Sequence, residues 1–263
     1  MTLTSYTGDI NIQNSLIQTN GSTGRGGSIG ISGANSTTLI ASKVNAQGWS
    51  QGGTILIGND ARNGTLPFSL AANLDAQTII NSSQLDPENM TRGGFIETSG
   101  ATLNLLASIN AGRGGMWLID PYDFTIDATA ASAIITALNS QNVTIATSTS
   151  ATTPSTSVTG VSGNGDITIN SPIYSFSTYS LTLNAARNIN INAEIILNSS
   201  FSATAVTLIS INANVSTNGA QTYTGPVNIA SDVVLDTTFG IQTTTYNYSS
   251  SSQLGSYVGA VLV

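Results

Sequence analysis

Three aspartates near the middle of the chain, Asp120, Asp123 and Asp127, are its first candidates for chemistry. Carboxylate oxygens are the ligands that Ca²⁺ prefers, and two carboxylates at a suitable separation hydrolyse glycosidic bonds. A structural interpretation is simpler: Asp120 starts a turn at Pro121, Asp123 closes that turn, and Asp127 caps a following helix. The structural interpretation is favoured, because enzymes that cleave polysaccharides line a long cleft with several acids and cations, and this chain has few. We therefore predict no metal ion, no cofactor and no catalytic residue.

Three other side chains near these aspartates have a functional and a structural interpretation. Trp117 and Tyr122 are candidate glycan contacts, because aromatic faces suit pyranose rings. The favoured alternative is that Trp117 fills a junction between structural elements. Glu97 is a single acid among apolar neighbours, which predicts a buried, hydrogen-bonded carboxyl rather than a catalyst.

The composition excludes several classes of partner. Of 263 residues only 7% are charged, whereas 97 are Ser, Thr or Asn and 40% are hydrophobic. An ordinary soluble domain has about 25% charged residues. The net charge is −7 and the six cations are scattered, which argues against nucleic acid and against anionic lipid. No apolar run reaches the ~18 residues of a membrane-spanning helix.

The chain has neither cysteine nor histidine. It therefore lacks thiolate chemistry, disulfides and the commonest general base and metal ligand. A rigid fold without thiols is suited to export through a periplasm, where stray thiols would cross-link.

A short phrase recurs along the chain: a glycine, then two aliphatic residues separated by one residue. It occurs at residues 8–12, 27–31, 53–57 and 165–169, with looser copies at 181–183, 189–191, 206–208 and 227–229. The spacing is 22 residues from Ile167 to Ile189 and 21 from Val206 to Val227. A short strand repeated at this period stacks on itself and buries a continuous aliphatic column. The sequence therefore predicts an all-β fold, a β-solenoid.

The repeats divide the chain into segments of one continuous domain. We predict coils over 1–57, an excursion from the stack over 58–92, coils over 93–127, a short helix and a Ser/Thr-rich loop over 128–164, and coils over 165–263. The helix is expected over 128–138, with Asp127 as its N-cap. Ten to twelve coils would make a rod about 50 Å long.

Three alternatives remain open, one for the fold and two for the function. A β-helical carbohydrate-active enzyme or carbohydrate-binding module is suggested by the acidic and aromatic residues named above. An antiparallel β-sandwich is suggested by the Asn-Gly pairs at 20–21, 63–64 and 218–219, which are hairpin signals in isolation. The glycine before each strand and the regular period favour the solenoid. An ice-binding β-solenoid is suggested by the threonine runs at 147–149 and 243–245, although such a function needs aligned Thr-x-Thr phrases in every coil.

Two motifs resemble a known family. The segment GGFIETSG at 93–100, followed by GGMWLIDPYD at 114–123, resembles the signature of the filamentous haemagglutinin-like large adhesins. Similar stretches are the helix at 131–138 with Val143–Ile145, the run from Gly165 to Ala185, and Gln221–Val227. The likeness covers most of residues 20–240, and the tryptophan motif is its most specific part.

The resemblance implies a right-handed parallel β-helix shaft on the surface of a Gram-negative bacterium, exported by two-partner secretion through an outer-membrane transporter. It implies adhesion to a host glycan or surface protein, without enzymatic activity. The amino-terminal secretion domain of that family and a signal peptide are not evident upstream of Gly8, so we expect a shaft fragment of a longer protein. Exposed strand edges at its terminal coils would favour end-to-end self-association.

Overall fold

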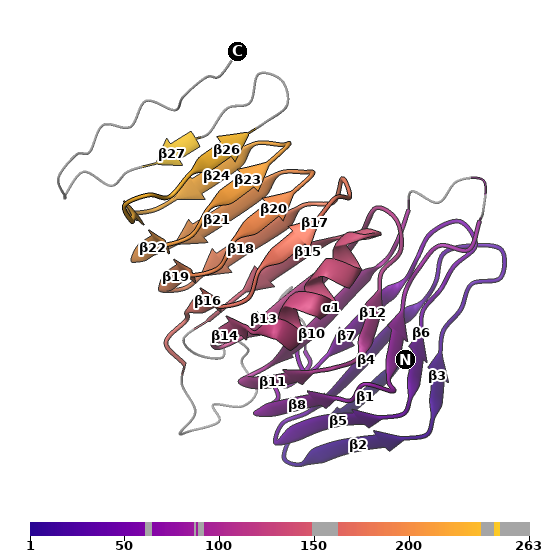
Figure 1. The fold of residues 1–263 in the computed structure, drawn as a ribbon. Helices are drawn as coiled ribbons and strands as arrows, with labels where there is room; N and C mark the ends of the chain where they lie inside the picture. The colour runs from indigo at the N-terminus through magenta and orange to yellow at the C-terminus, as the bar shows by residue number, and fades with distance from the viewer. Residues whose placement is uncertain (61–64, 87, 89–91, 149–162, 238–244, 248–263) are drawn as a thin grey trace.

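The chain folds as a parallel β-helix, in which successive turns of the backbone stack on one another (Figure 1). The computed structural model describes residues 1–60, 65–86, 88, 92–148, 163–237 and 245–247. Every strand pairing in these residues is parallel. This confirms the solenoid and excludes the antiparallel sandwich.

Each coil contributes a strand to one continuous sheet, here called face 1, which holds ten strands in the described residues. Its strands are β1 (Thr2–Ser5), β4 (Ser28–Gly33), β7 (Thr54–Ile57), β10 (Phe95–Gly100), β13 (Gly115–Pro121), β15 (Gln141–Ala146), β18 (Leu181–Ala185), β21 (Phe201–Ala205), β24 (Gln221–Thr224) and β27 (Thr245–Asn247). At about 4.8 Å between strands, this sheet is roughly 45 Å long.

The other two faces of the coil are each divided into two separate sheets. Face 2 holds β2 (Asp9–Gln13), β5 (Ser36–Ile40), β8 (Ala71–Leu74) and β11 (Thr102–Leu105), then β14 (Phe124–Ile126), β16 (Ile167–Ile169), β19 (Asn188–Ile191), β22 (Leu208–Ile211) and β25 (Val227–Ile229). Face 3 holds β3 (Leu16–Gln18), β6 (Lys43–Asn45), β9 (Ile79–Asn81) and β12 (Ser108–Asn110), then β17 (Ile173–Ser175), β20 (Ile195–Leu197), β23 (Val215–Thr217) and β26 (Leu235–Thr237).

Inward-pointing side chains stack from coil to coil into an unbroken apolar core. One column on face 1 is at most 1% exposed and contains Ile29, Ile55, Ile96, Trp117, Val143, Leu181 and Phe201. Full burial of each such side chain stabilises the fold by about 1.5–3 kcal/mol. Alternation of apolar and polar residues along each strand therefore gives one buried and one outward surface.

The predicted register is right at one pair of repeats and wrong at another. Ile167 pairs with Ile189, 22 residues later, as the sequence predicts. Val206 does not pair with Val227: it is 74% exposed and precedes β22, and Ile209 occupies the register position opposite Val227. The strand in this coil thus begins two residues later than its looser sequence copy indicates.

Paired glycines begin face 1 in the N-terminal coils because the backbone of a neighbouring corner touches them. A Cβ on Gly94 would lie 2.3 Å from the carbonyl oxygen of Gly53 and 2.5 Å from that of Ser82. A Cβ on Gly52 would lie 1.8 Å from the same Ser82 oxygen. Only glycine permits this approach.

Asparagine ladders brace the corners of the C-terminal coils. Asn192 donates to Asn170 (3.0 Å), and Asn212 donates to Asn192 (2.9 Å). Each amide thus links one coil to the next, as the recurrence of asparagine after strands indicates.

The predicted excursion over 58–92 is wrong in its middle. β8 and β9 lie in this range and are regular strands of faces 2 and 3. The interruption therefore consists of two insertions that flank a normal coil segment. Residues of the first, Leu66 and Phe68, are buried: Leu66 packs with Leu56 and Phe95 on the outer surface of face 1.

The helix α1 (Ala128–Leu138) confirms the sequence prediction, and it explains why face 3 is divided. Asp127 is its N-cap, and its Ile134 and Leu138 side chains are fully buried. Figure 1 shows α1 between β12 and β17, in the position along face 3 where the coil of β13 and β14 would otherwise have a strand. Face 1 runs past the helix without a break.

In the described residues, no helix is long and apolar enough to cross a membrane. The predicted Ser/Thr-rich loop and the threonine run at 243–245 lie mostly outside the described residues.

Candidate functional site

The two candidate glycan contacts are both buried, so the structure contradicts that assignment. Trp117 in β13 is fully inside the core, and its indole Nε1 donates to Thr98 Oγ1 at 3.0 Å. Tyr122 is 6% exposed and stacks on Phe68, with ring centroids 5.0 Å apart. Neither ring offers a free face to a sugar. Trp117 fills the core of the coil that leads to α1, as the favoured alternative predicts.

Asp123 and Asp127 both accept hydrogen bonds from backbone N–H groups. Asp127 Oδ1 accepts the Ala130 N–H at 2.9 Å, which confirms its role as helix cap. Asp123 accepts the N–H groups of Asn164 (2.9 Å) and Asp166 (2.8 Å), so it fastens its own coil to the next. No cluster of three or more acidic, histidine or cysteine side chains in the described part of the chain is arranged to hold a metal.

Asp120 does not start a turn, contrary to the sequence interpretation. It lies within β13, on the outward side of face 1, opposite Ser99 of β10 and beside Ile119, which points inward. Burial raises the pKa of the Asp120 carboxyl to about 6. A carboxyl that is largely removed from water resists ionisation, because its charged form loses hydration.

Glu97 is fully buried and hydrogen-bonded, as predicted. It lies on the outward side of β10, opposite Leu56 of β7 and Leu118 of β13, and accepts a hydrogen bond from Ser99 Oγ at 2.9 Å. The nearby first insertion, through Leu66, covers this part of face 1. Sequence alternation alone would place Glu97 in solvent, and the insertion makes it part of a second, outer layer.

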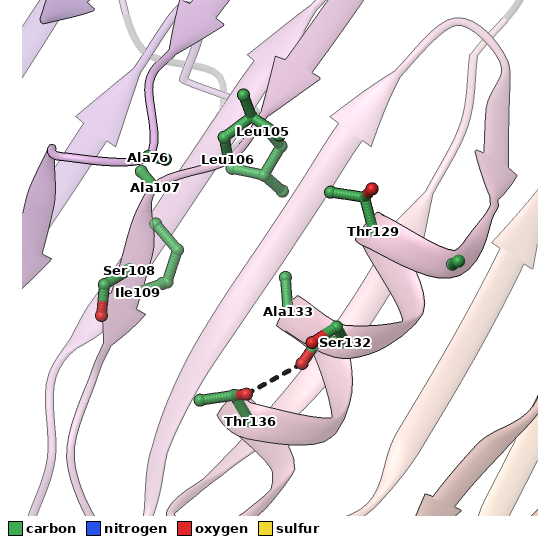
Figure 2. Close-up of a pocket in the computed structure, with 11 residues that line it drawn as sticks. Ala76, Leu105, Leu106, Ala107, Ser108, Ile109, Thr129, Ser132, Ala133 and Thr136 are labelled. Atoms are coloured by element: carbon green, nitrogen blue, oxygen red, sulfur yellow. Dashed lines mark hydrogen bonds between the residues drawn. The ribbon is translucent and has the colours of Figure 1, made fainter.

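A groove lies between the β11–β12 corner and α1 (Figure 2). Its volume is about 520 Å³. One wall is the continuous segment Leu105–Ile109 together with Ala76, and the other is a stripe along the helix formed by Ala128, Thr129, Ser132, Ala133 and Thr136. Every lining residue is uncharged, and Leu106 is 44% exposed at the groove.

Sequence reasoning missed this groove. Its helical wall carries small residues, which ordinarily indicate only a solvated helix face. The helix departs from the strand repeat, and that departure was the one sequence signal that the stack is interrupted here.

The strand wall of the groove presents backbone groups without a partner strand. The N–H groups of Thr102, Leu106 and Ser108 donate to the preceding coil, at Leu70, Leu74 and Thr78. Since backbone groups of a strand alternate in direction, those of Leu103, Leu105 and Ile109 face the other way, toward the following coil, which contains β14 and α1. β11 and β12 are the last strands of their sheets, so no described strand pairs with these groups.

A second surface feature lies on the outward side of face 1 in the C-terminal coils. Two columns of mostly hydroxyl and amide side chains run along it in register: Thr144, Thr182, Ser202 and Thr222, and two residues further on Ala146, Asn184, Thr204 and Thr224. The columns contain no charged residue. Neighbours are about 4.8 Å apart along a column and about 6.6 Å apart along a strand.

No protein-family model, curated protein or solved structure matches this chain.

Proposed function

We propose that this chain is a non-enzymatic shaft of a secreted bacterial adhesin, which presents flat, uncharged surfaces for attachment to a host glycan, a surface protein or another cell. The observation that carries the proposal is the continuous stack of face 1, whose two outward columns in the C-terminal coils carry hydrogen-bonding groups and no charge. A stack in which each coil contacts only its neighbours extends without a new core design, which suits a projecting rod. The motifs at 93–100 and 114–123 point to the same family of adhesins.

The acidic side chains support a binding role rather than catalysis. Asp123 and Asp127 are occupied with backbone N–H groups. Glycoside hydrolysis requires two available carboxyls about 5–10 Å apart. The alternative proposal, a carbohydrate-active enzyme, would be supported by hydrolysis of polysaccharides that is lost in the Asp120→Asn variant.

The attachment role is tested by coating beads with the purified protein and measuring their adhesion to glycan arrays, matrix proteins and cultured cells. We expect saturable adhesion to at least one class of surface, with little dependence on salt because the presenting faces are uncharged. Beads coated with heat-unfolded protein are the control. Adhesion no greater than that control on every surface would contradict the proposal.

The proposed cellular location is the outer surface of a Gram-negative bacterium, reached through an outer-membrane transporter. Surface labelling of intact cells that produce the full-length protein, with and without its transporter, tests this. We expect labelling to depend on the transporter.

We also propose end-to-end association through β1, β2 and β3, whose outer edges are unpaired in the described residues. Sedimentation velocity over a range of concentrations tests this association.

A second candidate function, ice binding, is favoured by one observation: the two aligned columns on face 1. An ice-binding face needs a regular array of hydroxyls, and here Ser202, Asn184 and Ala146 interrupt the threonines. Thermal hysteresis of the wild-type protein, compared with a Thr204→Lys variant, decides between the two functions. Hysteresis that the variant abolishes would favour ice binding.

A further inference from the structure

The groove beside α1 coincides with the one place where faces 2 and 3 stop within the stack. Elsewhere along these faces each inner strand pairs on both sides. β11 and β12 pair only with β8 and β9, while α1 occupies the next position along face 3. The edge toward the helix is therefore open in the interior of the molecule, not at an end of the rod.

The direction of the unpaired groups is supported by a hydrogen bond at the end of β12. The Ala111 N–H belongs to the same outward series as that of Ile109, and a side chain satisfies it: Gln141 Oε1 accepts the Ala111 N–H. The N–H groups of Leu105 and Ile109 point away from β8 and β9, and on that side no strand of the described residues pairs with β11 or β12. Backbone amides without acceptors are unfavourable when water is displaced, so a ligand here must supply carbonyl oxygens.

We propose that this groove binds an extended, uncharged polypeptide segment of a partner protein, which adds as a further parallel strand to the β11–β12 edge. The proposal deepens the adhesin function by naming a peptide-binding site on the shaft. Donors and acceptors two residues apart along the edge match an extended backbone, and strand addition is a general mode of peptide recognition. The groove volume of about 520 Å³ accommodates only the few residues of such a segment that lie between Leu105–Ile109 and α1, and the rest of the segment lies outside the groove.

The lining of the groove restricts the side chains of that segment. All eleven lining residues are uncharged, so a charged side chain placed there would lose hydration without gaining a partner. Ala128 and Ala133 leave space opposite the strand edge, and Leu105 and Ile109 provide an apolar surface. The lining contains no aromatic ring for stacking on a sugar, which favours a peptide over a glycan.

The chain itself contains a segment with the required chemistry. Residues 102–111, TLNLLASINA, pair in the same way with the preceding coil, and they are uncharged. A synthetic peptide of this sequence, acetylated, amidated and carrying a fluorophore, is therefore a suitable probe. We expect saturable binding to the whole protein by fluorescence anisotropy.

Two methylated peptides separate strand addition from apolar adhesion. N-methylation at the positions equivalent to Thr102, Asn104 and Ser108 removes the N–H groups that would donate to the edge, and we expect at least tenfold weaker binding. N-methylation at the positions equivalent to Leu103, Leu105 and Ile109 alters the opposite side, and we expect less than a threefold change. Equal binding of the two methylated peptides would overturn the proposal.

Two protein variants locate the binding site. Ser132→Trp fills the groove from an exposed position on α1, and we expect at least tenfold weaker binding. Thr125→Trp places the same side chain on the exposed surface of β14, outside the groove, and we expect no change. Circular dichroism verifies that both variants are folded. Undetectable binding of the probe by wild type, or an unchanged affinity in Ser132→Trp, would refute the site, whereas the bead assay would still report on adhesion.

Discussion

Arg187 reaches across one coil to Asp166: its Nε lies 2.8 Å from Asp166 Oδ1, and its Nη2 lies 2.5 Å from Oδ2. Asp166 also accepts the Asn188 N–H at 3.1 Å. Because Asp123 in turn accepts the Asp166 N–H, the two aspartates and the arginine link three successive coils at one corner. These three charged side chains therefore hold neighbouring coils together in a chain that has few charged residues.

The first prediction concerns the pH dependence of this contact. The hydrogen bond from Arg187 is the main cause that holds the pKa of Asp166 below its usual value. Because the folded-state pKa is the lower one, the stabilisation is present above the unfolded pKa and is lost as the pH falls through the folded pKa. We expect Arg187→Met to lower the Tm by about 2 °C at pH 7, since both side chains are partly exposed.

Thermal unfolding of the wild type and of Arg187→Met between pH 2 and pH 7 measures this effect. The difference in Tm should shrink as the solution becomes more acidic. A difference that persists unchanged at pH 2 would show that the arginine acts through packing of its stem and not through Asp166.

The second prediction has the opposite sign and concerns Asp120. Burial raises its pKa to about 6, so the folded protein binds this proton more tightly than the unfolded chain. The free energy of unfolding therefore decreases as the pH rises from about 4 to 6. Above pH 6 the Asp120 carboxyl is ionised in the folded protein, and the loss of stability is complete. We expect Asp120→Asn to stabilise the fold by about 1–3 kcal/mol at pH 8 and by almost nothing at pH 4.

Urea unfolding at the two pH values checks this prediction, with Asp232→Asn as the exposed control. Equal midpoints of Asp120→Asn and wild type at pH 8 would mean that the Asp120 carboxyl is well hydrated in solution.

The third prediction tests the glycine pairs. Gly94→Ala places a methyl group 2.3 Å from the Gly53 carbonyl oxygen. This clash can be relieved only if the backbone of one coil moves away from the other. We expect a loss of at least about 3 kcal/mol, or failure to fold. Gly24→Ala is the matched control: its Cβ would meet nothing within 4 Å, and its effect should be within about 0.5 kcal/mol. Chemical denaturation of both variants measures the two effects, and similar midpoints would contradict the close approach.

The fourth prediction tests the register of the C-terminal coils. Ile209 is fully buried opposite Val227, whereas Val206 is 74% exposed. We expect Ile209→Ala to cost about 2–5 kcal/mol and Val206→Ala less than about 0.5 kcal/mol. Comparison of their urea midpoints distinguishes the observed register from the one that the looser sequence repeat indicates. The reverse order of effects would restore the sequence-based register.

Much of the fold follows from local patterns. The glycine–aliphatic phrase identifies strands such as Ile167–Ile169, and the spacing to Ile189 predicts their stacking, because one coil of a solenoid has a nearly constant length. Asp127 followed by an alanine-rich segment predicts α1, because capping and helix propensity are properties of a short stretch of chain.

The insertions limit that prediction. Charged residues within 58–92 obscure the period there, although β8 and β9 preserve the coil. At Val206 the alternation of residue types permits two registers, and the choice depends on pairing with strands about 20 residues away on either side.

By itself, the sequence determines that this chain is a stack of parallel coils with an aliphatic interior, because period-two alternation and coil length are encoded locally. Tertiary structure alone decides which outward residues are covered. Tyr122 is buried because Phe68 of the first insertion stacks on it, and the groove exists because α1 takes the place of a strand on face 3. Both outcomes depend on contacts between segments distant in sequence, and no local pattern specifies such contacts.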